Sequence, residues 1–98
     1  MQLSEKQKRH LKALAHHRKV IVQTGAAGLT AAVLAEIGHA LDAHELLKVR
    51  LVTEERDDRQ AMIEQICETT GAAFVQRVGH VATFYRPHPD KPIIRLPG

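Results

Sequence analysis

The chain has 98 residues, of which 44% are hydrophobic and only 3% aromatic, so we expect residues 1–98 to form one domain with an aliphatic core. Lys and Arg number 14 against 11 Asp and Glu, a formal net charge of +3, which suits an anionic partner without establishing one. A lone cysteine, Cys67, excludes an internal disulfide. Charges recur throughout residues 1–17, so we expect neither a signal peptide nor a membrane span, and a cytoplasmic protein.

The first predicted element is a helix that begins at Ser4, which forms a capping-box pattern with Gln7. Leu11, Leu14 and Ala15 define its buried stripe, and the helix ends at residues 16–18. Its exposed face is strongly basic. The basic residues on this helix and just after it are Lys6, Lys8, Arg9, Lys12, His16, His17, Arg18 and Lys19.

A short β-branched run at residues 20–22 predicts a buried strand. It leads into a glycine loop, Gly25-Ala26-Ala27-Gly28, after which Thr30 can cap a second helix. Apolar residues of this helix recur at helical spacing until it ends near His44. They are Val33, Leu34, Ile37 and Leu41.

Apolar and other residues alternate over residues 47–52, which predicts a strand with Lys48 and Arg50 on its outward face. A third helix follows, capped by Asp57 or Asp58 and ended by Gly71 in the left-handed conformation. Its apolar residues are Met62, Ile63, Ile66 and Cys67, among which we expect the thiol to be buried.

Two last strands, residues 73–78 and 81–86, flank Gly79-His80, which suits a type II′ hairpin turn. The order α-β-α-β-α-β-β predicts an α/β two-layer sandwich with one mixed four-stranded sheet, since both strand-helix-strand crossovers should be parallel and right-handed and the hairpin is antiparallel. Residues 87–98 contain all four prolines and are expected to be an irregular tail.

A G-x-x-G turn that leads into a helix lets the backbone approach a ligand without obstruction by Cβ atoms and directs free amides at an anion. KH-type modules hold an RNA backbone with such a loop. Two glycines at this spacing also occur by chance in ordinary turns. The basic helix in the same stretch of chain favours the binding interpretation over a merely solvated helix face.

Several motifs in register make the sequence similar to a known family. They are Lys12-Ala13-Leu14-Ala15-His16, Gly25-Ala26-Ala27-Gly28-Leu29-Thr30, His44-Glu45-Leu46-Leu47-Lys48-Val49-Arg50, Glu68-Thr69-Thr70-Gly71-Ala72, Val75-Gln76 and Tyr85-Arg86-Pro87. From Leu3 to Pro87 the chain resembles the CRM domain (chloroplast RNA splicing and ribosome maturation) in its free-standing bacterial form, the YhbY type.

The resemblance implies a mixed four-stranded sheet with helices, akin to the C-terminal domain of the bacterial initiation factor that prevents premature subunit joining. It also implies RNA binding without catalysis and a role in assembly of the large ribosomal subunit. The chain departs from the family at Ala26 and Ala27, where a basic or polar residue is frequent, and at Val20, where proline is frequent. The two alanines leave backbone amides as the loop's binding groups.

Other residue clusters do not indicate an enzyme or a metalloprotein. The seven histidines have no recognised metal-ligand spacing. An acidic cluster of Glu54, Glu55, Asp57 and Asp58 lies beside arginines, which indicates a helix cap and a solvated loop. No Ser or Cys has the surroundings of a nucleophile. We therefore expect no cofactor, no metal and no small-molecule substrate. His44 is expected to cap the C-terminal end of the second helix, where the helix dipole favours a cation.

Lys48 and Arg50 on one strand, with Tyr85 and Arg86 on the last, are candidates for a further RNA-binding surface. Few aromatic residues are available, which favours recognition of backbone and shape over base stacking. The predicted RNA-binding residues are Gly25, Ala26, Ala27, Gly28, Lys6, Lys8, Arg9, Lys12, Arg18, Lys19, Lys48, Arg50 and Arg86.

The leading hypothesis is a monomeric, non-catalytic protein that binds ribosomal RNA in large-subunit precursors. One alternative is an adaptor whose basic helix docks an acidic protein partner. A third interpretation, binding of double-stranded DNA, predicts a preference for duplex DNA over structured RNA.

Overall fold

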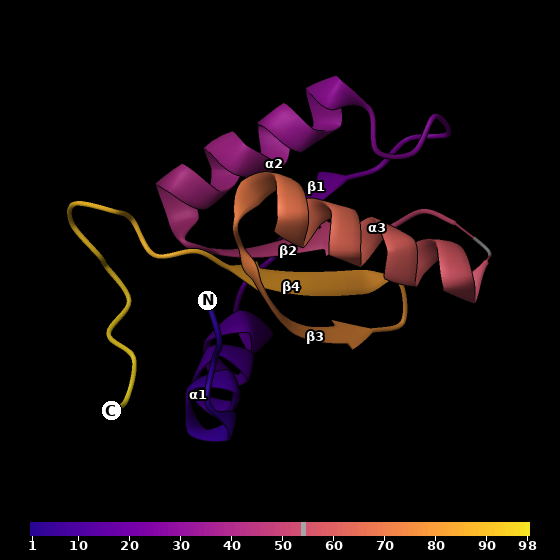
Figure 1. The fold of residues 1–98 in the computed structure, drawn as a ribbon. Helices are drawn as coiled ribbons and strands as arrows, with labels where there is room; N and C mark the ends of the chain where they lie inside the picture. The colour runs from indigo at the N-terminus through magenta and orange to yellow at the C-terminus, as the bar shows by residue number, and fades with distance from the viewer. Residues whose placement is uncertain (54) are drawn as a thin grey trace.

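The computed structural model describes residues 1–53 and 55–98 and confirms the predicted α/β class and element order. Three helices and four strands follow one another along the chain (Figure 1). Their bounds are α1 Glu5–His16, β1 Val20–Gln23, α2 Ala31–His44, β2 Leu46–Arg50, α3 Arg56–Thr70, β3 Ala73–Val78 and β4 Val81–Tyr85. Across the described ranges, no helix combines the length and apolar character needed to span a bilayer.

The four strands form one mixed sheet in the order β1-β2-β4-β3. β1 and β2 are parallel neighbours joined through α2, as the first crossover predicts. β2 and β3 also run in the same direction, but β4 lies between them and pairs antiparallel with both. The hairpin strand therefore occupies the position beside β2.

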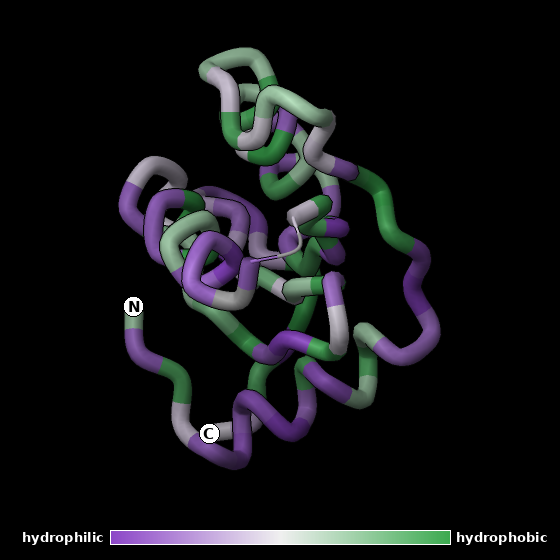
Figure 2. Tube along the Cα trace, turned by 90° about the vertical axis from the view of Figure 1, so that its right-hand side faces the viewer, coloured by the Kyte–Doolittle hydropathy of each residue, from purple (hydrophilic) through white to green (hydrophobic). Residues whose placement is uncertain are grey.

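The two faces of the sheet are covered unequally. α2 and α3 lie together on one face, and α1 lies on the other (Figure 1). Hydrophilic and hydrophobic segments alternate along the helices, as expected for helices that bury one side (Figure 2). The larger core, between the sheet and α2 and α3, includes Val22, Ile37, Leu41, Val49, Ile66 and Phe84. A smaller core beneath α1 consists of Leu11, Ala15, Leu46, Val75 and Tyr85.

Several predicted local signals are confirmed. The hydroxyl of Ser4 accepts the Gln7 amide at 3.1 Å while the Gln7 side chain accepts the Ser4 amide at 3.0 Å. Thr30 caps α2 by accepting the Val33 amide at 3.2 Å. Gly71 ends α3 with φ +75°. Gly79, with φ +60°, starts the hairpin turn, and the next residue does not share that positive φ, which fits type II′.

Two local predictions are wrong. β1 is not a buried strand, because it is the sheet edge: only Val22 is buried and Ile21 is exposed. Neither Asp57 nor Asp58 caps α3. The N-cap is Glu55, without a side-chain hydrogen bond, and the two aspartates lie in the first turn, where the helix dipole favours their charge. The Glu54 of the acidic cluster lies outside the described residues.

The thiol of Cys67 is partly rather than fully buried, because its position lies at the margin of the larger core. Burial nevertheless raises the pKa of this thiol. Since the thiolate is the reactive form, the thiol is a poor nucleophile at neutral pH.

The C-terminal tail is irregular, as predicted, yet it is packed against the domain. Ile94 and Leu96 lie on the smaller core beneath α1. The Gln7 side chain donates to the carbonyl of Pro97 at 3.2 Å. The buried carboxylate of Glu45 holds the tail by accepting three of its backbone amides.

Candidate nucleic-acid interface

The helix α1 covers only part of its sheet face, and the rest forms an open groove of about 730 Å³. Helix residues and the segment leading to β1 form one side of the groove, and strand residues form its floor. The lining residues are Lys12, His16, Arg18, Lys19, Val20, Lys48, Arg50, Gln76, Val78, Val81 and Thr83. None of these lining residues, all within the described part of the chain, is acidic.

The pairing of the four strands places two rows of side chains across the sheet, and these rows form the groove floor. One row joins Lys48 to Val20 on β1 and to Thr83 on β4, which in turn pairs with Gln76 on β3. The next row contains Arg50, Val81 and Val78. Lys48 and Arg50 therefore lie on one face of β2, as the sequence predicted, and on this face they line the groove.

Two of the groove cations are held in place by backbone carbonyls. The ammonium of Lys48 donates to the carbonyls of Ala15 at 3.2 Å and Arg18 at 3.1 Å. The guanidinium of Arg18 donates to the carbonyls of His44 at 3.1 Å and Leu46 at 3.2 Å. Both contacts join the end of α1 to β2 and leave the positive charges in position at the groove.

The remaining groove cations, Lys12, Lys19 and Arg50, are exposed. Within the described ranges the only ion pairs are Lys8–Glu5 at 4.0 Å and Arg86–Asp42 at 2.7 Å. The charges of the groove are therefore not neutralised by neighbouring carboxylates in this part of the chain, and an anion that enters meets five Lys and Arg side chains.

The glycine loop is a tight exposed turn between β1 and α2. The Gly28 amide donates to the Gly25 carbonyl at 3.0 Å, and the Thr30 amide donates to the Gly28 carbonyl at 3.1 Å. Gly28 needs to be glycine because its φ is +76°, whereas Gly25 has ordinary φ and open space around it. Ala26 and Ala27 are exposed between them, and no backbone hydrogen bond from either amide to another described residue is present.

The loop begins where the groove ends. Gln23, the last residue of β1, pairs with Arg50, and the Thr24 amide donates to the Arg50 carbonyl at 3.0 Å. Thr24 is itself buried and accepts the Val52 amide at 2.8 Å, so this junction is rigidly held. A strand rises about 3.3 Å per residue, so the three steps from Val20 to Gln23 place the two ends of β1 about 10 Å apart. The cations near α1 and the loop thus lie at opposite ends of one path, with Lys48 and Arg50 between them.

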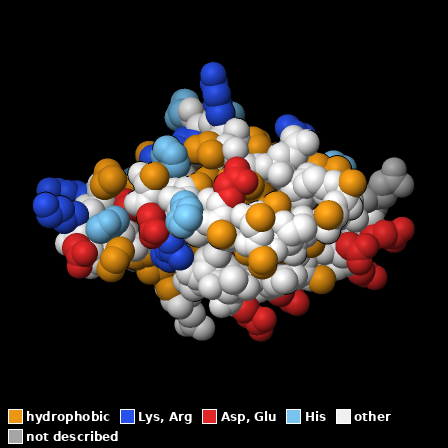
Figure 3. Space-filling view, turned by 90° about the horizontal axis from the view of Figure 1, so that it is seen from above, with side chains coloured by type: hydrophobic (Ala, Val, Ile, Leu, Met, Phe, Trp, Pro, Cys, Tyr) orange, Lys and Arg blue, Asp and Glu red, His pale blue; other side chains and the backbone are white. Residues whose placement is uncertain are grey.

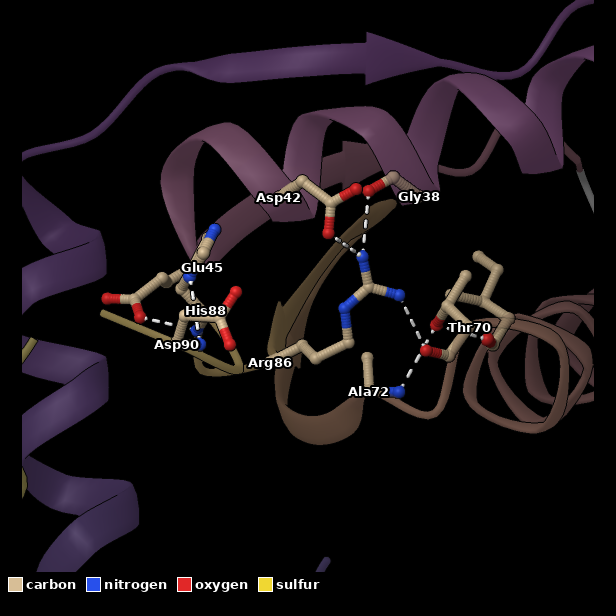
Figure 4. Close-up of polar contacts among 9 residues, drawn as sticks. Gly38, Asp42, Glu45, Thr70, Ala72, Arg86, His88 and Asp90 are labelled. Carbon is tan, nitrogen blue, oxygen red and sulfur yellow. Dashed lines mark hydrogen bonds and ion pairs between the residues drawn. The ribbon is translucent and has the colours of Figure 1, made fainter. Parts of the chain in front are cut away.

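Four predicted cations lie outside the groove. Lys6 and Arg9 are exposed on α1, and Lys8 lines a separate depression beside Cys67 and Phe74. Arg86 lies on the other side of the sheet, where its guanidinium donates to the carbonyls of Gly38 and Thr70 and to the carboxylate of Asp42 (Figure 4). Arg86 therefore joins α2 to α3 and does not share a face with Lys48 and Arg50.

The face formed by α2 and α3 differs in charge from the groove. Acidic side chains lie at the right and lower margins of this face and also near its centre, and histidines with Lys or Arg side chains and further acidic ones lie toward the left (Figure 3). The acidic residues of the two helices are Glu36, Asp42, Asp57, Asp58, Glu64 and Glu68. The sheet therefore separates a basic face from a largely acidic one.

Tyr85 cannot supply the stacking ring that the sequence suggested, because it is only 2% exposed. It belongs to the core beneath α1. Burial, together with the charge of Glu45, raises the pKa of its phenol. Phe84 is also buried, and Phe74 packs against it with ring centroids 6.2 Å apart. The groove floor is consequently aliphatic and polar rather than aromatic.

Sequence reasoning missed Gln76, Thr83, Val78 and Val81 as groove residues. Predicting them requires the strand order and the exact pairing of β3 with β4, which no local motif in these strands indicates. The alternating pattern of β2, by contrast, was sufficient to place Lys48 and Arg50 on one face.

The comparisons with known proteins agree with this architecture. Residues 3–86 match the model of the CRS1/YhbY (CRM) domain. The chain therefore belongs to the CRM domain family, in agreement with the resemblance of its motifs.

Three similar proteins illustrate the family. A Haemophilus influenzae protein named RNA-binding protein is 47% identical, over 97% of this chain and 95% of its own. The probable RNA-binding protein YqeI of Bacillus subtilis is 32% identical, over 97% of this chain and 99% of its own. The solution structure of a Staphylococcus aureus protein, for which RNA binding has been suggested, superimposes with a TM-score of 0.84 at 33% identity. The superposition covers 98% of this chain and 100% of the Staphylococcus aureus chain.

Proposed function

We propose that this chain is a non-catalytic RNA-binding protein that binds ribosomal RNA in precursors of the large ribosomal subunit and assists their assembly. The observation that carries the proposal is the basic groove, which extends from the end of α1 to Arg50, the partner of the last residue of β1 just before the glycine loop. RNA binding is also the activity named for the relatives from Haemophilus influenzae and Bacillus subtilis. The ribosomal target rests on the resemblance to bacterial CRM proteins.

In the proposed complex, the RNA backbone lies along the groove. Phosphates interact with Lys12, Lys19 and Arg50, and Lys48 and Arg18 add charge from fixed positions. The amides of the loop bind a phosphate at the far end, and the first amides of α2 add the favourable end of the helix dipole. Lys6, Lys8 and Arg9 contribute longer-range attraction from the rest of α1.

A charge-reversal experiment tests the groove directly. The variant Lys12→Glu/Lys19→Glu/Arg50→Glu should bind a ribosomal RNA fragment far more weakly than the unmodified protein. Each lost phosphate contact should reduce the slope of log K against log salt by about 0.7 to 0.9. The matched control Arg77→Glu/Lys91→Glu/Arg95→Glu changes the same charge at exposed positions outside the groove and should retain most of the affinity and slope.

Equal losses in the two triple variants would contradict a groove-specific interface and indicate only general charge attraction. The ribosomal target has its own test, which is crosslinking in cells followed by sequencing of the attached RNA. Enrichment of large-subunit precursor RNA with the unmodified protein, and its loss with the groove variant, is the expected result. Enrichment of unrelated RNA would contradict the assembly role while leaving RNA binding intact.

A further inference from the structure

Irregularities in the sheet decide which side chains reach the groove floor. In β3 the register shifts between Phe74 and Gln76, which leaves Val75 as an extra residue. With strict alternation, Gln76 would lie on the same face as Phe74, toward α2 and α3. The bulge instead pairs Gln76 with Thr83 on the groove face. Bulges of this kind redirect side chains at functional sites.

The redirected Gln76 lies in one row with a cation. Lys48, Thr83 and Gln76 occupy three neighbouring strands, so the backbones of Lys48 and Gln76 are about 10 Å apart. Gln76 is partly exposed, and no side-chain hydrogen bond joins Gln76 or Thr83 to another described residue. Gln76 lines the groove, so its amide is accessible there, whereas Thr83 is buried, with only 1% exposure.

The chemistry of the floor changes across the sheet. Cations lie on the side of β1 and β2, neutral polar groups lie on β4 and β3, and Val78 and Val81 are next to them. Phosphates should bind on the cationic side, formed by β1 and β2. The neutral polar groups with aliphatic neighbours suit the ribose, which has hydroxyl groups and carbon–hydrogen surface. A base would find no exposed aromatic ring on this floor on which to stack.

We propose that Gln76 binds the ribose 2′-hydroxyl of the strand in the groove and so distinguishes RNA from DNA. This inference rests on the proposed function and adds the sugar as the group recognised. An amide side chain can both donate and accept a hydrogen bond, as can the 2′-hydroxyl. That hydroxyl is the group by which a protein separates the two nucleic acids.

The test compares one hairpin sequence prepared as RNA, as DNA and as 2′-O-methyl RNA. The unmodified protein should bind RNA more tightly than either analogue. Gln76→Met keeps the length of the side chain and removes its hydrogen bonds, so it should weaken RNA binding about fivefold and leave DNA binding unchanged. The control Gln65→Met, at an exposed position of α3, should match the unmodified protein for all three ligands.

Gln76→Leu is the second variant, since it also removes the hydrogen bonds of the amide with a side chain of similar size, and thermal unfolding of each variant establishes that it is folded. It should also lose affinity for RNA selectively. Equal loss for RNA and DNA, no loss for RNA, or a loss that follows base sequence instead of sugar would overturn the inference while leaving RNA binding in place. Absence of RNA binding by the unmodified protein would overturn the proposed function as well.

Discussion

The carboxylate of Glu45 accepts the backbone amide of His88 at 2.7 Å, and this contact joins the end of α2 to the C-terminal tail. The same carboxylate accepts the amides of Ile93 at 2.9 Å and Ile94 at 2.7 Å. Its own carbonyl accepts the Arg86 amide at 2.9 Å. Glu45 is fully buried and has φ +61°, an uncommon value for a residue with a side chain. We infer that these hydrogen bonds hold this backbone conformation.

The first prediction concerns stability and pH. Burial raises the pKa of Glu45, but the amides of His88, Ile94 and Ile93 lower it more, so the net pKa lies below the ordinary value of 4.5. A lowered pKa in the folded state means that the ionised carboxylate stabilises the fold above about pH 4.5. This contribution is lost as the pH falls through the lowered folded value.

The variant Glu45→Gln should therefore unfold at a lower temperature at pH 7, with a loss of about 1–3 kcal/mol. Its deficit relative to the unmodified protein should shrink as the pH falls through the folded pKa of Glu45. Thermal unfolding across pH measures both effects. A deficit that stays constant with pH would show that the charge of Glu45 does not contribute.

The second prediction separates Arg86 from RNA binding. Arg86→Ala leaves Asp42 and the Thr70 carbonyl without their partner, so the free energy of unfolding should fall by about 2–3 kcal/mol. RNA affinity should be unchanged at a temperature where the variant is folded, because Arg86 lies between α2 and α3. Denaturant unfolding and a binding titration measure the two quantities. A selective loss of RNA affinity would return Arg86 to the interface.

The third prediction distinguishes the two loop glycines. Gly28→Ala places a side chain at φ +76° and should reduce stability by about 1 kcal/mol. Gly25→Ala should be neutral or slightly stabilising, because its φ is ordinary and nothing lies within 4 Å of the added Cβ. Thermal unfolding of the two single variants gives the comparison. Equal effects would contradict the backbone geometry of this turn.

The fourth prediction concerns the loop as a phosphate site. Gly25→Asp/Ala26→Asp adds two negative charges at exposed positions with no expected effect on the fold. RNA affinity should fall at least tenfold, because the charges repel the phosphate that the amides bind. Gly25→Asn/Ala26→Asn has similar size without charge and serves as the control. Full RNA affinity in the folded aspartate variant would exclude the loop from the interface.

Much of the local structure could be predicted because its causes lie within a few residues. The capping box at Ser4 and Gln7, the Thr30 cap and the left-handed Gly71 each depend on contacts over at most four positions. The failed cap at Asp57 and Asp58 shows the limit of this reasoning. Several neighbouring acidic residues could occupy the N-cap, and composition alone does not choose among them.

Two of the predicted binding residues could be placed on one face of the sheet for a different reason. Lys48 and Arg50 share a face because strand alternation is a local rule, so their place in the groove agrees with the prediction. The sequence did not reveal that Tyr85 is buried under α1, or that hydrogen bonds to α2 and α3 hold Arg86 on the other side of the sheet, because both depend on packing between distant residues.

By itself the sequence determined the order of helices and strands, the glycine turn and the basic character of α1, because periodicity, caps and charge are read directly from neighbouring residues. The tertiary structure alone decided that β4 lies between β2 and β3, that a bulge turns Gln76 into the groove, and that Glu45 holds the tail. These features arise from pairing and packing between residues distant in the chain, whose register depends on the whole sheet.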